Sequence, residues 1–225
     1  ESDPLDALEK RYSGLANKTS NHSSKILAAI DHFACEWGSK VVLVAVGSVG
    51  VELTDILSVN PMLRQRIAAV ITLQSPYAGS ALANDFPMQL PKFNAILPKF
   101  FFPSNFPFEE LLYKQRKSFV SSHPYPSDGL PTCSLCLTID KQAAEKHYVV
   151  GAGVNYLESQ YNQASDGIVF ADDTLIPNAY FAHFGGLTFS PKVESNQRAT
   201  LNQLRQYHLP SLIIVTMQQL LEKIT

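Results

Sequence analysis

The chain has 225 residues, with 18 basic and 20 acidic side chains and a formal net charge of -2. Neither sign of charge gathers into a run, which argues against nucleic-acid binding, and no apolar stretch approaches the roughly 20 residues that a membrane-spanning helix needs. The length suits one domain, residues 1–225, with a core large enough to fold without disulfide bonds.

The start of the chain and its cysteines bear on its cellular setting. The chain opens at Glu1 with no charged and apolar leader, so we expect neither a signal peptide nor a transmembrane segment within it. Cys35, Cys133 and Cys136 form an odd, sparse set, which does not favour a disulfide framework or a metal site. We therefore expect a soluble protein and leave its compartment open.

The first third of the chain alternates between helical and strand patterns. Residues 24–37 place apolar side chains at helical spacing, with Gly38 in the position of a C-terminal cap. Residues 40–46 (KVVLVAV) form a continuous apolar run typical of a strand buried on both faces of a parallel sheet. Residues 51–57 resume helical spacing, and residues 67–73 (IAAVITL) predict a second strand. This alternation implies a parallel sheet with right-handed crossovers, in which the first strand is central.

Residues 86–131 differ from the rest in being rich in proline and phenylalanine. Recurring prolines do not suit a regular sheet, and the aromatic content argues against disorder. A fixed cap on the core and a mobile lid therefore both remain open. As a lid, its inner face is expected to carry Phe100, Phe101 and Phe102 as substrate-binding residues that contact a lipid surface when the lid opens.

The second half of the chain is predicted to hold several strands followed by two helices. Strands are expected at residues 133–139, 148–154, 168–170 and 179–182, and helices at residues 194–207 and 211–224. No internal repeat and no low-complexity tract interrupts these segments.

The turn after the first predicted strand has the layout of a nucleophile elbow. There a buried strand ends at a Gly-Ser-x-Gly turn and re-enters a helix, which presents the candidate nucleophile Ser48 at the edge of the sheet. Gly47 and Gly50 allow a tight turn, and the backbone N–H of Val49 is the candidate oxyanion donor beside the positive end of the helix dipole. The alternative is a plain strand-to-helix connection or a phosphate-binding turn, with Ser48 as its N-cap.

Three later segments resemble bacterial lipases and related esterases of the α/β-hydrolase superfamily. Residues 72–85 (TLQSPYAGSALAND) resemble the segment after the family's next strand, and residues 165–169 (SDGIV) resemble its acid loop. Residues 183–187 (HFGGL) are similar to its histidine loop. The resemblance covers residues 24–207. It implies a parallel-sheet α/β-hydrolase-like domain in three parts, namely residues 24–85, 86–131 and 132–225.

The resemblance also implies a catalytic triad, since Ser48, Asp166 and His183 follow one another in the order that this fold imposes. His183 would accept the proton of Ser48, and Asp166 would hold the imidazole in its working tautomer.

Each member of the acid and base pair has an alternative. Asp166 precedes a glycine and could shape a turn, in which case Asp172 or Asp173 could be the acid. His183 could be a structural, hydrogen-bonded histidine near a strand end, and His208 is then the reserve base.

The leading interpretation is a serine hydrolase of the lipase or carboxylesterase type that cleaves a carboxylic ester through an acyl-enzyme and needs no metal or organic cofactor. The alternative is a catalytically degenerate domain that binds a protein or a lipid. The family has glycine two residues before the serine where this chain has Val46, and no segment before residue 24 supplies the second oxyanion donor. Acyl transfer to an alcohol would use the same residues, and the oligomeric state is open.

Overall fold

The computed structural model describes residues 21–89, 108–145 and 148–185. In chain order the elements are α2 (Asn21–Trp37), β1 (Val41–Val46), α3 (Ser48–Val59), the 3-10 helix η1 (Pro61–Arg66), β2 (Ile67–Leu73), α4 (Ala81–Gln89), the 3-10 helix η2 (Phe108–Leu111), α6 (Tyr113–Ser122), β3 (Thr132–Thr138), α7 (Lys141–Ala144), α8 (Tyr148–Tyr161), the 3-10 helix η3 (Asp172–Thr174) and β4 (Tyr180–Gly185).

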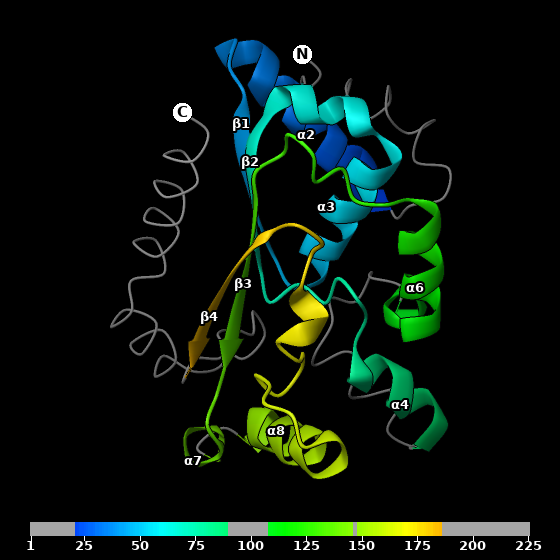
Figure 1. Ribbon diagram of the computed structural model, residues 1–225, viewed down its shortest axis with the longest axis vertical. Coiled ribbons are helices and arrows are strands. Elements are labelled where there is room, and N and C mark those ends of the chain that lie inside the picture. The colour runs from blue at the N-terminus through cyan, green and yellow to red at the C-terminus, as the bar shows by residue number, and fades with distance from the viewer. Residues whose placement is uncertain (1–20, 90–107, 146–147, 186–225) are drawn as a thin grey trace, which may run out of the picture.

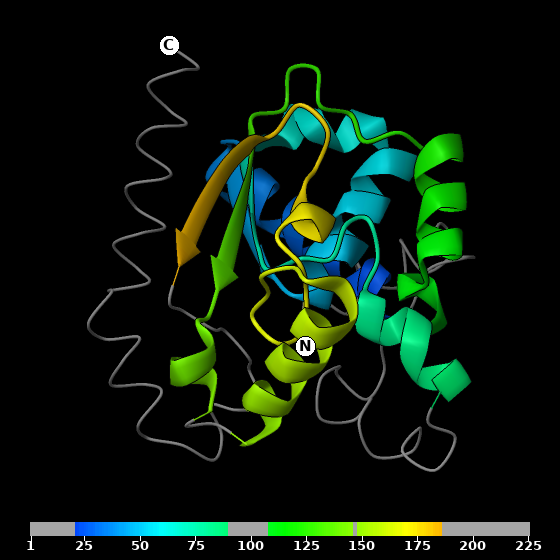
Figure 2. The ribbon, with the colours of Figure 1, turned by 60° about the horizontal axis from the view of Figure 1, so that its bottom comes forward.

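The predicted parallel sheet is confirmed. Its four described strands lie in the order β1-β2-β3-β4, and each neighbouring pair is parallel. Figure 1 shows α2, α3 and α6 on one side of the sheet, and the arrows of β3 and β4 point toward α7 and α8. The turned view of Figure 2 also places α7 and α8 at the ends of these arrows. These two helices therefore mark the carboxyl edge of the sheet, which is where open parallel sheets bind ligands.

The prediction that the first strand is central is wrong for the described part of the chain. There β1 is the edge strand of the sheet, and its Val44 side chain is 42% exposed. The inner strands β2 and β3 are buried on both faces, and in β2 the consecutive residues Val70 and Ile71 are both fully buried. An apolar, β-branched run favours a strand, but it does not specify the strand's neighbours.

Two clusters of apolar side chains cover the two faces of the sheet. One lies between the sheet and the helices α2, α3 and α6, and it includes Ile30, Leu53, Leu57, Val70 and Leu130. The cluster on the opposite face is built mainly from Ala69, Ile71, Leu73, Leu135 and Leu137. Alternate residues of β2 therefore enter opposite clusters, as the two-residue period of a strand requires.

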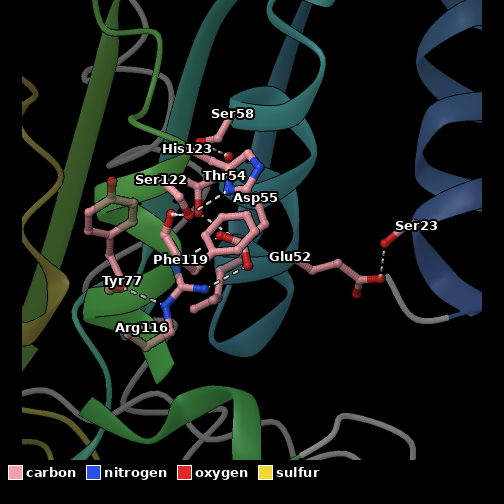
Figure 3. A network of polar contacts seen from close by, with 11 residues as sticks. Ser23, Glu52, Thr54, Asp55, Ser58, Tyr77, Arg116, Phe119, Ser122 and His123 are labelled. Atoms are coloured by element: carbon pink, nitrogen blue, oxygen red, sulfur yellow. Dashed lines mark hydrogen bonds and ion pairs between the residues drawn. The ribbon is translucent and has the colours of Figure 1, made fainter. Parts of the chain in front are cut away.

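A buried ion pair fixes α6 against α3. Arg116 of α6 is 2% exposed, and its two terminal nitrogens donate to the two carboxylate oxygens of Asp55 at 2.6 and 2.9 Å. Its Nε donates to the carbonyl oxygen of Tyr77 at 2.9 Å, and its guanidinium lies over the Phe119 ring (Figure 3). Burial raises the pKa of Asp55 even though Arg116 opposes this shift. The pair thus holds two charges in the interior by satisfying them mutually.

The predicted strand at residues 148–154 is wrong, because this segment begins helix α8. Its β-branched residues suggested a strand, but buried Val150, Val154 and Leu157 recur at helical spacing. Gly153 lets α8 approach the loop after it, since an added Cβ would lie 2.0 Å from the Gly167 carbonyl oxygen.

Three other predictions have mixed outcomes. Residues 168–170 form no strand beyond an isolated bridge between Ser165 and Phe170. The strand predicted at residues 179–182 is confirmed as β4. Residues 86–131 are not irregular throughout, since α6 lies within them.

The remaining predictions for residues 90–107 and 186–225, which include Phe100, Phe101, Phe102, His208 and the two final helices, lie outside the described residues. In the part of the chain that is described, no helix has the length and apolar character needed to cross a membrane.

Candidate active site

The turn between β1 and α3 reverses the chain direction at Gly47. This residue has φ 60° and ψ -136°, a combination that residues with a side chain rarely adopt. Its N–H donates to the Leu73 carbonyl at 2.8 Å, and its own carbonyl accepts the N–H of Gly50 at 3.0 Å. Within residues 21–89, 108–145 and 148–185, no atom lies less than 4 Å from a Cβ added at Gly47. The most sharply turned position is therefore not covered by this part of the chain.

Close packing beneath the turn explains the second glycine. A Cβ at Gly50 would lie 1.9 Å from Ser75 Oγ and 2.7 Å from Ser75 Cβ, so any side chain there would displace the segment after β2. Gly47 and Gly50 thus serve different needs, since Gly47 provides a positive φ and Gly50 provides space.

Ser48 and Val49 form the first turn of α3. Ser48 is 7% exposed, whereas Val49 is 44% exposed. The first N–H groups of a helix have no partner within it, so both residues present backbone donors at the carboxyl edge of the sheet. The structure confirms that Ser48 begins a helix directly after the turn that follows β1. It places the Ser48 side chain in a largely buried position.

Asp166 lies at the carboxyl end of β3, where its preceding residue Ser165 accepts the N–H of Ile139 at 3.1 Å. The Asp166 side chain is 1% exposed, and its Oδ1 accepts the N–H groups of Ile168 and Val169, both at 2.8 Å. Burial raises the pKa of this carboxyl, and a hydrogen bond from the Gln74 side chain and the backbone donors oppose the shift. Asp166 therefore shapes its own turn, which is the structural role that the sequence left open.

His183 lies within β4 rather than on a loop after it. Its Nε2 is 2.9 Å from Thr138 Oγ1 on the neighbouring strand, and its ring stacks beside Phe181 with the two planes 9° apart. The side chain is exposed. A histidine that bonds a threonine hydroxyl across two strands has the satisfied, structural environment that was the alternative to catalysis.

The register of the sheet separates the backbone of the turn that carries Ser48 from that of His183. Val46 pairs with Leu73, Leu73 with Leu135, and Leu135 with Ala182, so His183 is level with Gly47 but three strands away. Neighbouring strands are about 4.8 Å apart, which puts these two backbones on the order of 14 Å apart. The Asp166 carboxylate is bonded to the backbone of Ile168 and Val169, and His183 is bonded to Thr138. The triad stays a prediction.

Gln74 is a polar residue at this edge that the sequence did not single out. It follows β2 with φ 51°, and its side-chain amide pairs with the backbone of Leu137 through bonds of 2.6 and 3.0 Å. The side chain thereby continues the ladder where β3 extends beyond β2, and it also reaches Asp166. A positive φ at a glutamine gives no sequence signal, because tertiary contacts impose it.

The alternative acids Asp172 and Asp173 lie in η3. Asp173 Oδ2 accepts the Tyr113 hydroxyl at 2.8 Å, and burial raises the pKa of Asp173 to about 6. Asp172 is exposed. Neither carboxylate bonds His183 among the described contacts, so neither takes over the role of the acid in this arrangement.

An apolar cavity of about 410 Å³ lies along the outer edge of β1, between this strand and α2. Its lining includes Phe33, Trp37, Val44, Val49 and Leu53. Asp166 and His183 do not line it. The described side chains contain no cluster of three or more His, Cys, Asp or Glu residues that could hold a metal ion.

Comparison with known proteins adds a fold assignment. No protein-family model and no curated protein sequence matches the chain. The mature form of the Bacillus licheniformis lipase BlEst2 is similar over 83% of this chain and 73% of that chain, with a TM-score of 0.61 and 20% identity. Its propeptide form gives a TM-score of 0.62 at 20% identity over 82% of this chain and 40% of that chain. A metagenomic carboxyl esterase gives a TM-score of 0.55 at 22% identity, over 74% of this chain and 51% of that chain.

The chain has an α/β-hydrolase-like fold. At these identities the likeness concerns the fold alone, and the chemistry at the carboxyl edge of the sheet depends on the residues that this chain places there. The expectation of an α/β-hydrolase-like parallel sheet is confirmed.

Proposed function

We propose that this domain recognises carboxylic esters at its carboxyl edge and that the turn formed by residues 47–50 binds the ester carbonyl. The observation that carries the proposal is the position of Ser48 and Val49, whose backbone N–H groups begin α3 directly after β1. Such donors suit the oxygen of a carbonyl group. The likeness of the fold to proteins titled lipase and carboxyl esterase supports an ester as the ligand.

Two forms of this function differ in their chemistry. In the first, Ser48 attacks the ester, His183 accepts its proton, Asp166 supports the histidine, and an acyl-enzyme forms and is then hydrolysed. This form is favoured by the presence of a serine at the start of α3, in a fold shared with lipases and esterases. Phe100, Phe101 and Phe102 would then bind the acyl part, as the sequence suggests.

In the second form the domain binds the ester without a covalent step. Three observations favour it: Ser48 is largely buried, Asp166 bonds the backbone of its own loop, and His183 bonds Thr138 three strands from the turn. The geometry supports this second form better, because a general base has to lie within hydrogen-bond reach of the proton that it accepts.

One titration separates the two forms. The ¹⁵N-labelled chain is mixed with ethyl butyrate, and amide shifts and ethanol release are followed in the same sample by NMR. Binding without chemistry moves the Ser48 and Val49 amide signals and releases no ethanol above the buffer rate. Ethanol release that disappears in a Ser48→Ala variant supports the acyl-enzyme form instead. If neither amide moves and no ethanol appears, the ester proposal is wrong.

A further inference from the structure

The tip of the elbow is the sharply turned residue between strand and helix, and Gly47 and Ser48 are the two candidates for this position. A nucleophile elbow works because a single sharply turned residue between strand and helix projects its side chain out of the turn. The turned residue can be identified here from its backbone. Gly47 has the positive φ and lies between the last residue of β1 and the first residue of α3, whereas Ser48 already belongs to the helix.

The space around the two positions gives the same assignment independently. A Cβ at position 47 would have no atom of the described residues within 4 Å, so none of these residues would keep a longer side chain from a ligand. Ser48 is only 7% exposed. A buried hydroxyl cannot approach the carbonyl carbon of a bound ester without movement of the turn.

We propose that position 47 is the nucleophile position of this elbow and that the native chain has no nucleophile there, because the residue is glycine. Ser48 then contributes its backbone N–H, since the oxyanion donor is the residue that follows the nucleophile. This replaces Val49 in the role of donor. The chemical consequence rests on the proposed ester site: a bound ester would meet a backbone donor but no hydroxyl placed for attack.

Cysteine substitution tests the assignment directly. The background variant Cys35→Ser removes the exposed native thiol, while Cys133 and Cys136 are buried. Gly47→Cys, Ser48→Cys and Val49→Cys are each made in this background, and alkylation by iodoacetamide is timed by intact mass under native conditions. Val49→Cys is the control for an exposed thiol in the same turn. We expect Cys at 47 to react at least about ten-fold faster than Cys at 48, because buried thiols are inert.

Equal or faster reaction at position 48 overturns the inference. Circular dichroism checks that each variant is folded, and if Gly47→Cys does not fold, Ser48→Cys decides alone, because it requires no positive φ. Slow alkylation there supports the inference, and fast alkylation overturns it.

Ethyl butyrate is then added as a protecting ligand. If it slows alkylation at position 47 but not at 49, the ester site is supported. Fast but unprotected reaction at 47 leaves the assignment of the tip intact and contradicts the ester proposal.

Discussion

Gly47 and Ser48 are adjacent in the chain, yet only the first is positioned to present a side chain to a ligand. A Cβ added to Gly47 would have no neighbour within 4 Å in the described part of the chain, whereas Ser48 is 7% exposed at the start of α3. The serine in the motif and the exposed position in the turn are therefore offset by one residue. This offset favours ester binding over acyl-enzyme formation.

Gly47→Ala is expected to destabilise the fold through backbone strain alone. The new Cβ clashes with no atom of the described residues, but alanine rarely adopts φ 60° and ψ -136°. The expected loss is about 1–3 kcal/mol in the free energy of unfolding, as for other strained backbone positions. Urea denaturation measures it. An unchanged midpoint would mean that position 47 does not hold the positive φ.

Gly50→Ala is expected to destabilise the fold by a different cause, which is overlap with Ser75. The Cβ would lie 1.9 Å from Ser75 Oγ, and overpacking of this kind typically costs about 1–3 kcal/mol or more. The second substitution Ser75→Gly removes both clashing atoms and should restore part of the loss. The same substitution should give no such rescue to Gly47→Ala, so each variant is the control for the other. Equal rescue of both would contradict the distinction between strain and clash.

Arg116→Met is expected to cost about 3–5 kcal/mol, because it leaves the Asp55 carboxylate buried without its cation. The pKa of Asp55 is already raised by burial and should rise further, so the loss should be larger at pH 7 than at pH 5. Denaturant titrations at both pH values measure the difference. Lys117→Met, an exposed substitution on the same helix, should change stability by less than about 0.5 kcal/mol.

A double variant keeps this test specific. Asp55→Leu combined with Arg116→Met removes both charges, and it should be less destabilising than Arg116→Met alone, because apolar replacement of a buried pair is often near neutral. If the double variant is as unstable as the single one, packing of the Arg116 side chain rather than its charge accounts for the loss.

Asp173 should make stability depend on pH in acid solution. Burial raises its pKa from 3.8 to about 6, so the folded state favours its protonated form. Its contribution to stability is therefore complete below about pH 4 and is lost as the pH rises through about 6, by at most about 3 kcal/mol. Asp173→Asn keeps an acceptor for the Tyr113 hydroxyl, and it should remove this dependence of the unfolding free energy on pH. The difference between native and variant unfolding free energies, measured from pH 4 to pH 7, should show this slope.

Asp172→Asn is the graded control for this prediction. Asp172 is one of the groups that raise the pKa of Asp173. Its neutralisation should therefore lower that pKa somewhat, and the pH range over which stability is lost should become narrower without disappearing. A profile identical to that of Asp173→Asn would assign the slope to Asp172 instead.

The sheet could be predicted from the sequence because β1 and β2 are almost continuous apolar runs. The predicted bounds of β2 and β3 agree with the structure to within one residue. The parallel pairing of β1 with β2 follows from the helix between them. The edge position of β1 could not be predicted, because pairing partners depend on the whole chain. The start of α8 was missed because β-branched residues carry a weak strand preference that tertiary packing overrides. The helical spacing of Val150, Val154 and Leu157 was the signal available.

The sequence predicts that the turn with Ser48 lies at the carboxyl edge of the sheet, and the structure has it there, but the backbone of the turn could not be predicted in detail. The Gly-Ser-x-Gly motif indicates a tight turn, yet it does not say which residue takes the positive φ, since this depends on where β1 ends. Gly47 itself was the available signal, because glycine is the residue best suited to such a conformation. The distance between Ser48 and His183 depends on the number of strands between them, which the motif order does not contain.

The most direct test is the reaction of the native chain with a fluorophosphonate, which labels an activated serine irreversibly. Intact mass is recorded for the native protein and for Ser48→Ala after equal exposure, with an active serine esterase in a parallel reaction to confirm the reagent. With glycine at the tip of the elbow, we predict that the native protein gains no mass while the esterase is labelled. An adduct on the native protein that maps to Ser48 and is absent from Ser48→Ala would contradict this and establish Ser48 as the nucleophile.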